Sequence, residues 1–288
     1  VYGIKPTYGT ASRYGVVAMA SSTDTMGCFA RSAEDIAVVM NVMAGQDPKD
    51  MTTLPDFFVP ATETPQQLKI GIINEAMGDG VDAEVRQAVS QYADALRSHG
   101  HTVETVSMPM LQHALAIYYI VVPAEISSNL ARYDGVRYGH RAEGVKTLAE
   151  LYGRSRDEGF MPENKRRIMI GSYVLSSGYF DAYYLQAQKA RTLLINEFNA
   201  LFEQYDMLLL PTAPTPAFGL GENSDDPLKM YLADIMTVPA SLAGLPALNV
   251  PAGVSQAGLP IGAQLIGPMQ SDATLLAVAT QAATERSA

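Results

Sequence analysis

A long uncharged stretch constrains the fold of this chain more than any other feature. Between Asp234 and Asp272 no residue carries a charge, yet proline and glycine interrupt the stretch at short intervals. The interrupting residues are Pro239, Gly244, Pro246, Pro251, Gly253, Gly258, Pro260, Gly262, Gly267 and Pro268. A membrane-spanning helix needs about 20 continuous apolar residues, and prolines at this frequency would break it repeatedly. The stretch therefore predicts short buried strands joined by tight turns.

Composition places the chain among ordinary globular proteins. Its 288 residues are 48% hydrophobic and 17% charged, and a chain of this length buries about 75% of its unfolded surface. The one cysteine, Cys28, argues against a disulfide-stapled secreted scaffold and favours the cytoplasm. The net charge of −10 does not give the positive field that nucleic-acid backbones require. We therefore expect no direct nucleic-acid binding by this chain.

Hydrophobic periodicity predicts a mixed α/β protein. The strand candidates are residues 68–73, 102–106, 207–210, 247–250 and 261–266. A helix predicted over 81–98 joins the first two, and such a crossover implies parallel pairing, with 102–106 at an edge. Helices are expected to dominate from 111 to 205, one beginning at Pro162 and another capped by Asp181, and a last helix is expected over 272–285.

The motifs of self-contained catalytic sites are absent from the sequence. There is no P-loop, no strand-coupled GxGxxG, no HExxH, no CxxC and no GxSxG. The four histidines, His99, His101, His113 and His140, do not have the spacing of metal ligands. We therefore expect no metal site, and these motifs leave the function open.

Several segments resemble the amidase signature family. The first are Lys5-Pro6-Thr7-Tyr8-Gly9, Ser12-Arg13-Tyr14-Gly15 and Ser21-Ser22. Further similar segments are 127–130, 133–139, 165–169, 179–184, 211–218, 225–234 and 258–267. Within the family, the pairing of KPTYG with SRYG is similar to the A subunits of glutamyl-tRNA(Gln) amidotransferases. The resemblance covers essentially the whole chain. It implies a single domain over 1–288 with the amidase signature fold, an α/β fold whose mixed sheet is covered by helices, incomplete here at the N-terminal side.

The resemblance also implies a function and partners. Members of the family hydrolyse amides with a Ser, cis-Ser, Lys triad, and the A subunits use it to release ammonia from glutamine. A partner B subunit then uses ATP, with Mg²⁺, to convert glutamate on misacylated tRNA to glutamine, and a small C subunit helps to hold the other two together. We accordingly expect glutamine as the ligand and the B and C subunits as partners, with tRNA contact only through the B subunit. We also expect no cofactor in this chain, no membrane association and a cytoplasmic location.

In the family, all three triad residues precede the KPTYG motif, which begins here at Lys5. The resemblance therefore places the triad upstream of Val1 and predicts no catalytic residue within this chain. The sequence also lacks an initiator methionine. We expect it to be the C-terminal part of a longer enzyme and to be inactive alone.

Three residues resemble those that bind glutamine in the family. Arg167 resembles the arginine that holds the carboxylate through a planar bidentate fork, and Asp234 resembles the aspartate that accepts the ammonium group. Tyr118 resembles a tyrosine lining the pocket, with the adjacent Tyr119 as the other candidate. Without the resemblance, Arg166 and Arg167 are typical of a solvated helix face. Asp234 is then typical of a capping carboxylate or a buried one, and the two tyrosines are typical of core aromatic residues.

Two other functions stay open. One is a general hydrolase of small amides from the same family, although the presence of Arg167 together with Asp234 argues against it. The other is a shortened pseudoenzyme that binds an amino acid or a partner without chemistry. Glutamine binding without ammonia release would favour the pseudoenzyme over the enzyme.

Overall fold

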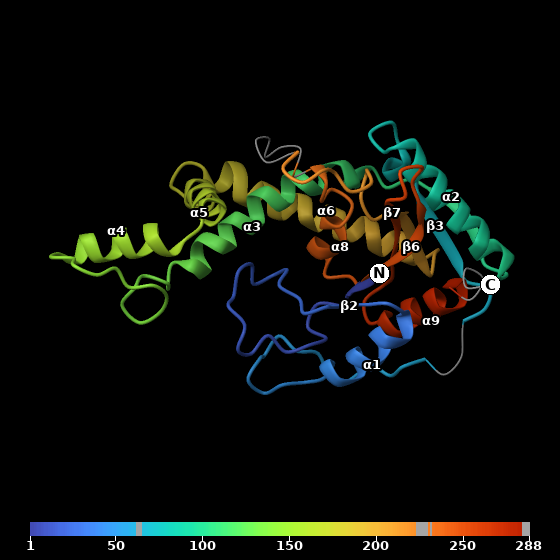
Figure 1. Cartoon of the computed structure of the whole chain (residues 1–288), viewed down its shortest axis with the longest axis horizontal. Helices are drawn as coiled ribbons and strands as arrows, with labels where there is room; N and C mark the ends of the chain where they lie inside the picture. The colour runs from blue at the N-terminus through green and yellow to red at the C-terminus, as the bar shows by residue number, and fades with distance from the viewer. Residues whose placement is uncertain (62–64, 223–229, 231, 284–288) are drawn as a thin grey trace. The chain divides into compact units, whose positions relative to one another are not determined.

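The computed structural model describes residues 1–61, 65–222, 230 and 232–283, and it divides into two compact units (Figure 1). Unit 1 comprises Val1–Tyr14, Thr25–Leu115 and Thr192–Ala288, and unit 2 comprises Gly15–Asp24 and Ala116–Arg191. Unit 2 is thus built from two segments that interrupt the sequence of unit 1. The division into compact units does not test the single domain predicted over 1–288, which remains a prediction.

A seven-stranded mixed sheet forms the centre of unit 1. In spatial order the strands are β2 (Cys28–Ala30), β1 (Tyr2–Lys5), β6 (Ala247–Val254), β7 (Pro260–Ile266), β5 (Met207–Pro211), β3 (Lys69–Ile73) and β4 (Thr102–Val106). Strand β3 pairs in parallel with β4 and β5, and the other neighbouring pairs are antiparallel. The mixed sheet predicted from the sequence is confirmed.

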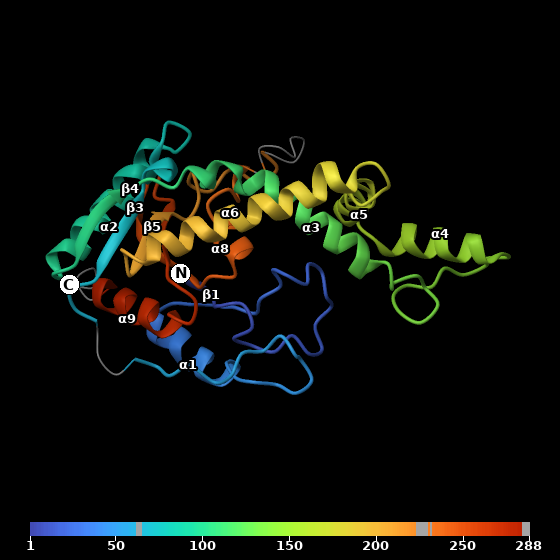
Figure 2. The same ribbon diagram turned by 180° about the vertical axis from the view of Figure 1, so that it is seen from behind.

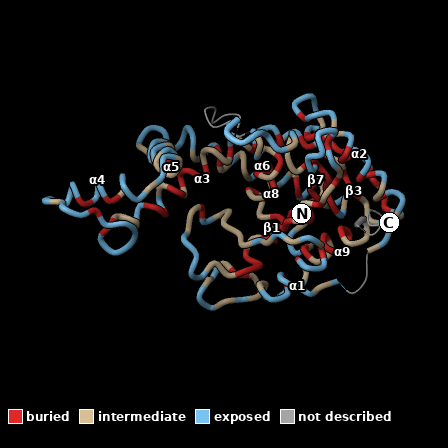
Figure 3. Tube along the Cα trace, viewed as in Figure 1, coloured by how far each residue is buried: buried red, intermediate tan, exposed pale blue. Residues whose placement is uncertain are grey.

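The uncharged stretch supplies two central strands of this sheet. Strands β6 and β7 pair from Ala247 with Ile266 to Val254 with Pro260, and Figure 3 shows buried residues gathered along β3 and β7. The register shifts between Pro251 and Gly253, which places one proline at an irregularity of the ladder, and Pro260 is the first residue of β7. Prolines are tolerated at both kinds of position. The two strands are therefore longer than the sequence pattern predicts.

Among the described residues, six helical segments lie within unit 1. They are α1 (Ala33–Met43), η1 (Asn74–Met77), α2 (Ala83–Ser98), η2 (Pro109–His113), α8 (Val238–Ala243) and α9 (Asp272–Ala283). Four of them, α1, η1, α2 and α9, contact the sheet. Helix α2 joins β3 to β4 in the predicted parallel crossover, and β4 lies at the edge of the sheet as expected. Helices α1 and α9 lie side by side in both views (Figures 1 and 2).

Unit 2 is helical. The helices that lie wholly or partly in it are α3 (Ala114–Leu130), α4 (Leu148–Gly159), α5 (Pro162–Val174), the π-helical turn η3 (Phe180–Tyr184) and α6 (Leu185–Phe202). Helix α5 begins at Pro162, as predicted. The prediction that Asp181 caps a helix is wrong. Asp181 lies inside η3, which runs directly into α6, so the backbone has no extended position for a cap there.

Helix α3 is unusually apolar. By length and composition alone, the helical segment Pro109–Leu130, which contains α3, could cross a membrane: its mean hydropathy is 1.2, and 44% of its apolar part is buried inside the structure. Within unit 2, Val122, Ile126 and Leu130 of this helix pack with Ala20 in a buried cluster. The apolar face is therefore used in the protein core, and we interpret α3 as a core helix.

Candidate functional site

Arg167 of α5 meets Tyr118 of α3 within unit 2. Its Nη1 donates to the Tyr118 hydroxyl over 3.3 Å, and its Nε donates to Glu163 Oε1 over 2.9 Å. The Arg167 side chain is 21% exposed, whereas that of Arg166 is 46% exposed. The interpretation of both arginines as a solvated face therefore describes Arg166 and not Arg167.

The surroundings of Arg167 keep it cationic. Burial by itself lowers the pKa of the guanidinium, but its hydrogen bonds to Glu163 and Tyr118 outweigh that effect and hold the pKa above its ordinary value. A partly buried arginine of fixed charge is suited to binding a carboxylate, because its planar fork matches the two oxygens.

A glycine brings the two helices close enough for this contact. Gly171 lies one turn after Arg167 on α5, and a Cβ added there would be 1.9 Å from the Pro123 carbonyl oxygen and 2.8 Å from Ser127 Cβ. A side chain at this position would push α5 away from α3. Because Tyr118 lies little more than one turn before Pro123, the same close approach brings its hydroxyl within reach of Arg167.

Tyr118, rather than Tyr119, presents its hydroxyl to Arg167. The two rings pack edge to face, with centroids 5.1 Å apart and an interplanar angle of 82°. Tyr118 also packs against the buried cluster of unit 2 together with Ile168. The structure thus brings together two of the three predicted site residues, Tyr118 and Arg167.

Asp234 belongs to unit 1 and lies in the turns that precede α8, where it is exposed. Its backbone carbonyl accepts hydrogen bonds from Thr237 N at 3.0 Å, from Thr237 Oγ1 at 3.0 Å and from Val238 N at 3.2 Å. The buried Gln264 of β7 donates to the Met236 carbonyl over 2.8 Å. These bonds fix a turn that holds Asp234 at the surface, so the interpretation of Asp234 as a buried carboxylate is wrong. The preceding residues of this motif, 225–229, lie outside the described part of the chain.

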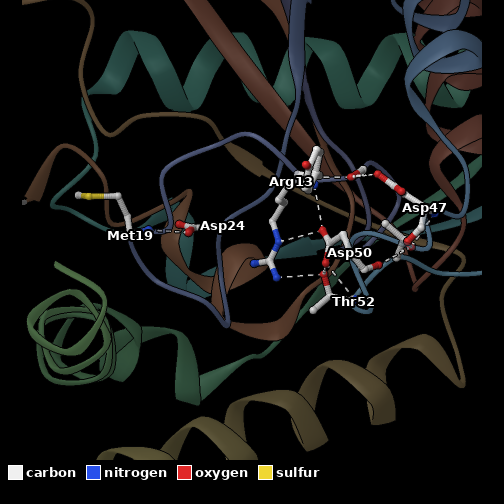
Figure 4. Close-up of polar contacts among 9 residues, drawn as sticks. Arg13, Met19, Asp24, Asp47, Asp50 and Thr52 are labelled. Atoms are coloured by element: carbon white, nitrogen blue, oxygen red, sulfur yellow. Dashed lines mark hydrogen bonds and ion pairs between the residues drawn. The ribbon is translucent and has the colours of Figure 1, made fainter. Parts of the chain in front are cut away.

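Ser12 and Arg13 of the SRYG motif are anchored to an acidic loop within unit 1 (Figure 4). The backbone N–H of Arg13 donates to Asp50 Oδ2 over 2.9 Å, and its Nη2 donates to Thr52 Oγ1 over 2.9 Å. The Ser12 hydroxyl donates to Asp47 Oδ2 over 2.6 Å. The motif therefore fixes the loop around residues 47–52, and these contacts explain its residues by structure.

Other motif segments hold each other within unit 2. The carboxylate of Asp24 accepts from Met19 N at 2.8 Å (Figure 4) and from Ala20 N at 3.0 Å. Asn129 Nδ2 donates to the Met19 carbonyl over 3.0 Å and to Ser21 Oγ over 2.8 Å. Asn129 of the segment 127–130 is thus bonded to Ser21 of the Ser21-Ser22 segment and to the backbone just before it.

The KPTYG motif lies in a buried network of unit 1. Asp272 accepts from Thr7 N at 2.8 Å and from Thr7 Oγ1 at 2.6 Å. Desolvation raises the pKa of Asp272, and the hydrogen bonds from Thr7 oppose this. Burial lowers the pKa of Lys5 to about 8, although the charge of Asp272 opposes this shift. Lys5 Nζ donates to the Pro6 carbonyl over 2.9 Å, and the charges of Lys5 and Asp272 influence each other while both are desolvated.

Two of the four histidines, His101 and His140, make side-chain contacts with the protein. His101 accepts from Leu68 N at its Nδ1 over 3.2 Å, and its Nε2 lies 3.2 Å from Gln281 Oε1. His140 Nε2 lies 2.9 Å from Glu158 Oε2. Across the residues that the structure describes, no three His, Cys, Asp or Glu side chains form a group that could hold a metal ion.

Sequence reasoning missed the part played by Glu163. The sequence pattern indicates only a helix start after Pro162, but the Glu163 carboxylate accepts from Arg167 at 2.9 Å and from Arg166 at 2.7 Å. The signal was present in the spacing, because residues three and four apart on a helix are neighbours. No comparable signal marks Gly171, whose close approach to α3 depends on tertiary packing.

Comparison with known families gives one match over most of the chain. A family model described as Amidase matches residues 1–276. The chain is 51% identical to the A subunit of glutamyl-tRNA(Gln) amidotransferase from Nostoc punctiforme, covering 97% of this chain and 59% of that protein. It is 52% identical to the protein of that name from Granulibacter bethesdensis, covering 100% of this chain and 58% of that protein. The chain thus spans just under three fifths of the length of these relatives.

Solved structures share the fold. The crystal structure of the glutamyl-tRNA(Gln) amidotransferase A subunit from Thermotoga maritima has a TM-score of 0.76 and 36% identity, covering 97% of this chain and 56% of that one. The 6-aminohexanoate cyclic dimer hydrolase has a TM-score of 0.77 at 24% identity, covering 99% of this chain and 60% of that one. The second likeness concerns the fold alone.

Proposed function

Because the chain belongs to the amidase family, we propose that it is the glutamine-holding part of the A subunit of a tRNA-dependent amidotransferase. The observation that carries this proposal is the identity of about half of the residues, over nearly the whole chain, with amidotransferase A subunits. The fold does not select the substrate, since the 6-aminohexanoate hydrolase is as similar in fold at 24% identity. The choice of glutamine therefore rests on sequence and on the residues around Arg167.

In this proposal, Arg167 binds the α-carboxylate of glutamine, which needs a fixed cation. The resemblance assigns the ammonium group to Asp234, and this part of the proposal rests on the sequence alone. The Tyr118 hydroxyl accepts a hydrogen bond from Arg167, which leaves its own O–H to donate to the carboxylate. The partly buried position of Arg167 and its raised pKa support this role.

The chemistry would come from the triad of the family. Its lysine takes a proton through the bridging serine from the nucleophilic serine, which attacks the amide carbon. The proton taken by the lysine passes to the amide nitrogen as the C–N bond breaks, so ammonia leaves, and water then hydrolyses the acyl-enzyme and releases glutamate. In the family these three residues precede the KPTYG motif, which begins here at Lys5. We propose that the 288 residues alone release no ammonia, and that the active enzyme also contains the triad segment of the family.

The partners follow from the same proposal. The B subunit would receive the ammonia, activate glutamate on Glu-tRNA(Gln) with ATP and Mg²⁺ and bind the tRNA, and the C subunit would help to hold the other two together. The net charge of −10 agrees with tRNA contact through a partner, because an acidic chain does not attract a phosphate backbone by itself. The complex would act in the cytoplasm, where aminoacyl-tRNA is used.

The test replaces Arg167 in an A subunit that carries both the triad and these 288 residues, within its complex. We expect Arg167→Ala to raise the KM for glutamine about 100-fold, because the substrate carboxylate loses a charge-assisted bidentate partner. The matched control is Arg154→Ala, which removes an exposed arginine of α4 that pairs with Glu158 and should leave KM unchanged. For both variants, the KM for glutamine is determined from the rate of ammonia release.

An unchanged KM in Arg167→Ala would contradict the pocket assignment. Equal cleavage of glutamine and of an amide without a carboxylate would indicate the general hydrolase of small amides instead. Glutamine binding without ammonia release in the native protein would indicate the pseudoenzyme.

A further inference from the structure

Glu163 lies in the first turn of α5 and bonds both arginines of the next turn. Its Oε1 accepts from Arg167 Nε over 2.9 Å, and its Oε2 accepts from Arg166 Nη1 over 2.7 Å. The Glu163 side chain is 43% exposed, and that of Arg167 is 21% exposed. The carboxylate therefore lies at the boundary between solvent and the partly buried guanidinium.

The hydrogen bonds of Arg167 use its donors unevenly. A guanidinium has five N–H donors, and it can hold a carboxylate through two atoms along either of two edges, Nε with Nη2 or Nη1 with Nη2. Here Nε is bound to Glu163, and Nη1 gives a hydrogen bond to Tyr118. Toward the described residues Nη2 makes no hydrogen bond. One edge is thus partly occupied, while the other keeps donors on both of its nitrogens.

We propose that Glu163 is a positioning residue that directs the glutamine carboxylate to the Nη1–Nη2 edge of Arg167. The inference rests on the proposed function. Glu163 does not touch the substrate in this scheme. It occupies Nε, and its negative charge repels a second carboxylate that approaches the Nε–Nη2 edge.

The consequence is a single orientation for the substrate. With one edge of Arg167 closed, the carboxylate has one way to bind, and the side-chain amide of glutamine lies at a fixed place relative to the guanidinium. Without Glu163, the arginine side chain regains freedom to turn, and either edge can take the carboxylate. Fewer bound molecules would then present the amide correctly, and misplacement of about 1 Å at the reacting group costs up to about 100-fold in rate.

A second ion pair of unit 2 serves as a matched control. Arg154 and Glu158 on α4 are also four residues apart, and Arg154 Nη2 lies 2.9 Å from Glu158 Oε1. Both side chains are more than a third exposed. Glu158 also lies 2.9 Å from His140 Nε2, so it contacts two side chains, as Glu163 does. Such surface pairs stabilise a helix only weakly, and Glu158→Gln shows what the loss of these contacts does on another helix of the unit.

The experiment uses the full A subunit with the triad, in its complex, and measures ammonia release from two substrates. One is glutamine, and the other is glutamine α-methyl ester, in which the carboxylate charge is removed. We expect Glu163→Gln to lower the preference for glutamine over the ester, as the ratio of kcat/KM, by about tenfold. The rate with the ester should hardly change. Glu163→Asp keeps the charge and should retain more of the preference, and Glu158→Gln should retain all of it.

The outcomes separate three cases. If Glu163→Gln changes both substrates equally or changes neither, the positioning role is overturned, since a purely structural pair would behave in that way. If Arg167→Ala removes the preference but Glu163→Gln does not, the positioning role fails and the carboxylate site stands. If Arg167→Ala also leaves the preference unchanged, the proposed function itself fails. The rate with the ester reports in every variant whether the active site is intact.

Discussion

Arg166 and Arg167 are neighbours of the same type, yet α5 gives them different surroundings. Successive residues of a helix point about 100° apart, so the side chain of Arg166 is 46% exposed and that of Arg167 is 21% exposed. Arg167 also has a hydroxyl from another helix within hydrogen-bond distance, that of Tyr118. At this scale the surroundings of a side chain, more than its type, make it a candidate for binding a carboxylate.

Asp50 leads to a prediction for acid stability. The hydrogen bond from the Thr52 hydroxyl is the main reason that the pKa of Asp50 lies at about 2, below its ordinary 3.8, and the backbone N–H of Arg13 adds to the effect. Because the folded pKa lies below the unfolded one, the stabilisation is complete above about pH 4 and is lost as the pH falls toward 2. It amounts to at most about 2 kcal/mol.

We therefore expect Asp50→Asn to lower the free energy of unfolding by about 1–2 kcal/mol at pH 6, with a difference from wild type that shrinks below pH 4. Urea unfolding followed by circular dichroism from pH 6 to pH 2.5 measures this difference. Asp94→Asn is the control, because Asp94 is 72% exposed in its pair with Arg97. A difference for Asp50→Asn that stays constant across this range would contradict the assignment.

On the scale of elements, the packing of α5 on α3 depends on Gly171. A Cβ there would lie 1.9 Å from the Pro123 carbonyl oxygen, and the backbone at that point cannot turn aside as a flexible side chain would. We expect Gly171→Ala to destabilise the protein by about 2–4 kcal/mol and to weaken glutamine binding, because the displaced helix carries Arg167 away from Tyr118. Thermal unfolding and glutamine calorimetry test the two effects.

Gly153 of α4 is the matched control for this substitution. It is also a glycine within a helix of unit 2, but a Cβ added there meets nothing within 4 Å. Alanine is the better helix former by about 1 kcal/mol, so Gly153→Ala should stabilise slightly and leave glutamine binding unchanged. Equal effects of the two substitutions would show that helix propensity, and not the α3 contact, governs Gly171.

Local elements could be predicted from the sequence, and their packing could not. The strand 102–106, the crossover helix and the start of α5 at Pro162 follow from periodicity and breakers, and the structure has them at those places. Asp181 failed as a cap because a π-helical turn continues the helix there. In the candidate site, resemblance pointed to Arg167 and Tyr118, and spacing alone could have indicated Glu163. The contact at Gly171 joins residues about 48 positions apart, and no local pattern encodes it.

On the scale of the whole chain, unit 1 is assembled from three separate segments, so contacts between distant residues hold it together. Thr7 and Asp272 are 265 positions apart and make two hydrogen bonds, both buried. The Thr7 hydroxyl also accepts from Gln270 N over 2.8 Å. The segment after the first strand is thereby joined to the start of α9. These hydrogen bonds therefore contribute to the free energy of unfolding of the whole unit.

Thr7→Val tests this connection with a side chain of nearly the same shape. The substitution removes one donor to the buried Asp272 carboxylate and the acceptor of Gln270 N, so we expect a loss of about 2–4 kcal/mol in the free energy of unfolding. Thr280→Val on α9 is the control, because its hydroxyl only donates to the Leu276 carbonyl one turn before it. Urea unfolding of both variants gives the comparison. Since the lost bonds join the two ends of unit 1, we expect Thr7→Val to lower the urea concentration at which half of the protein is unfolded. The unfolding transition should remain a single cooperative step. A loss below about 0.5 kcal/mol, as expected for an ordinary surface substitution, would show that the paired strands β1 and β6 hold the first segment without help from Asp272.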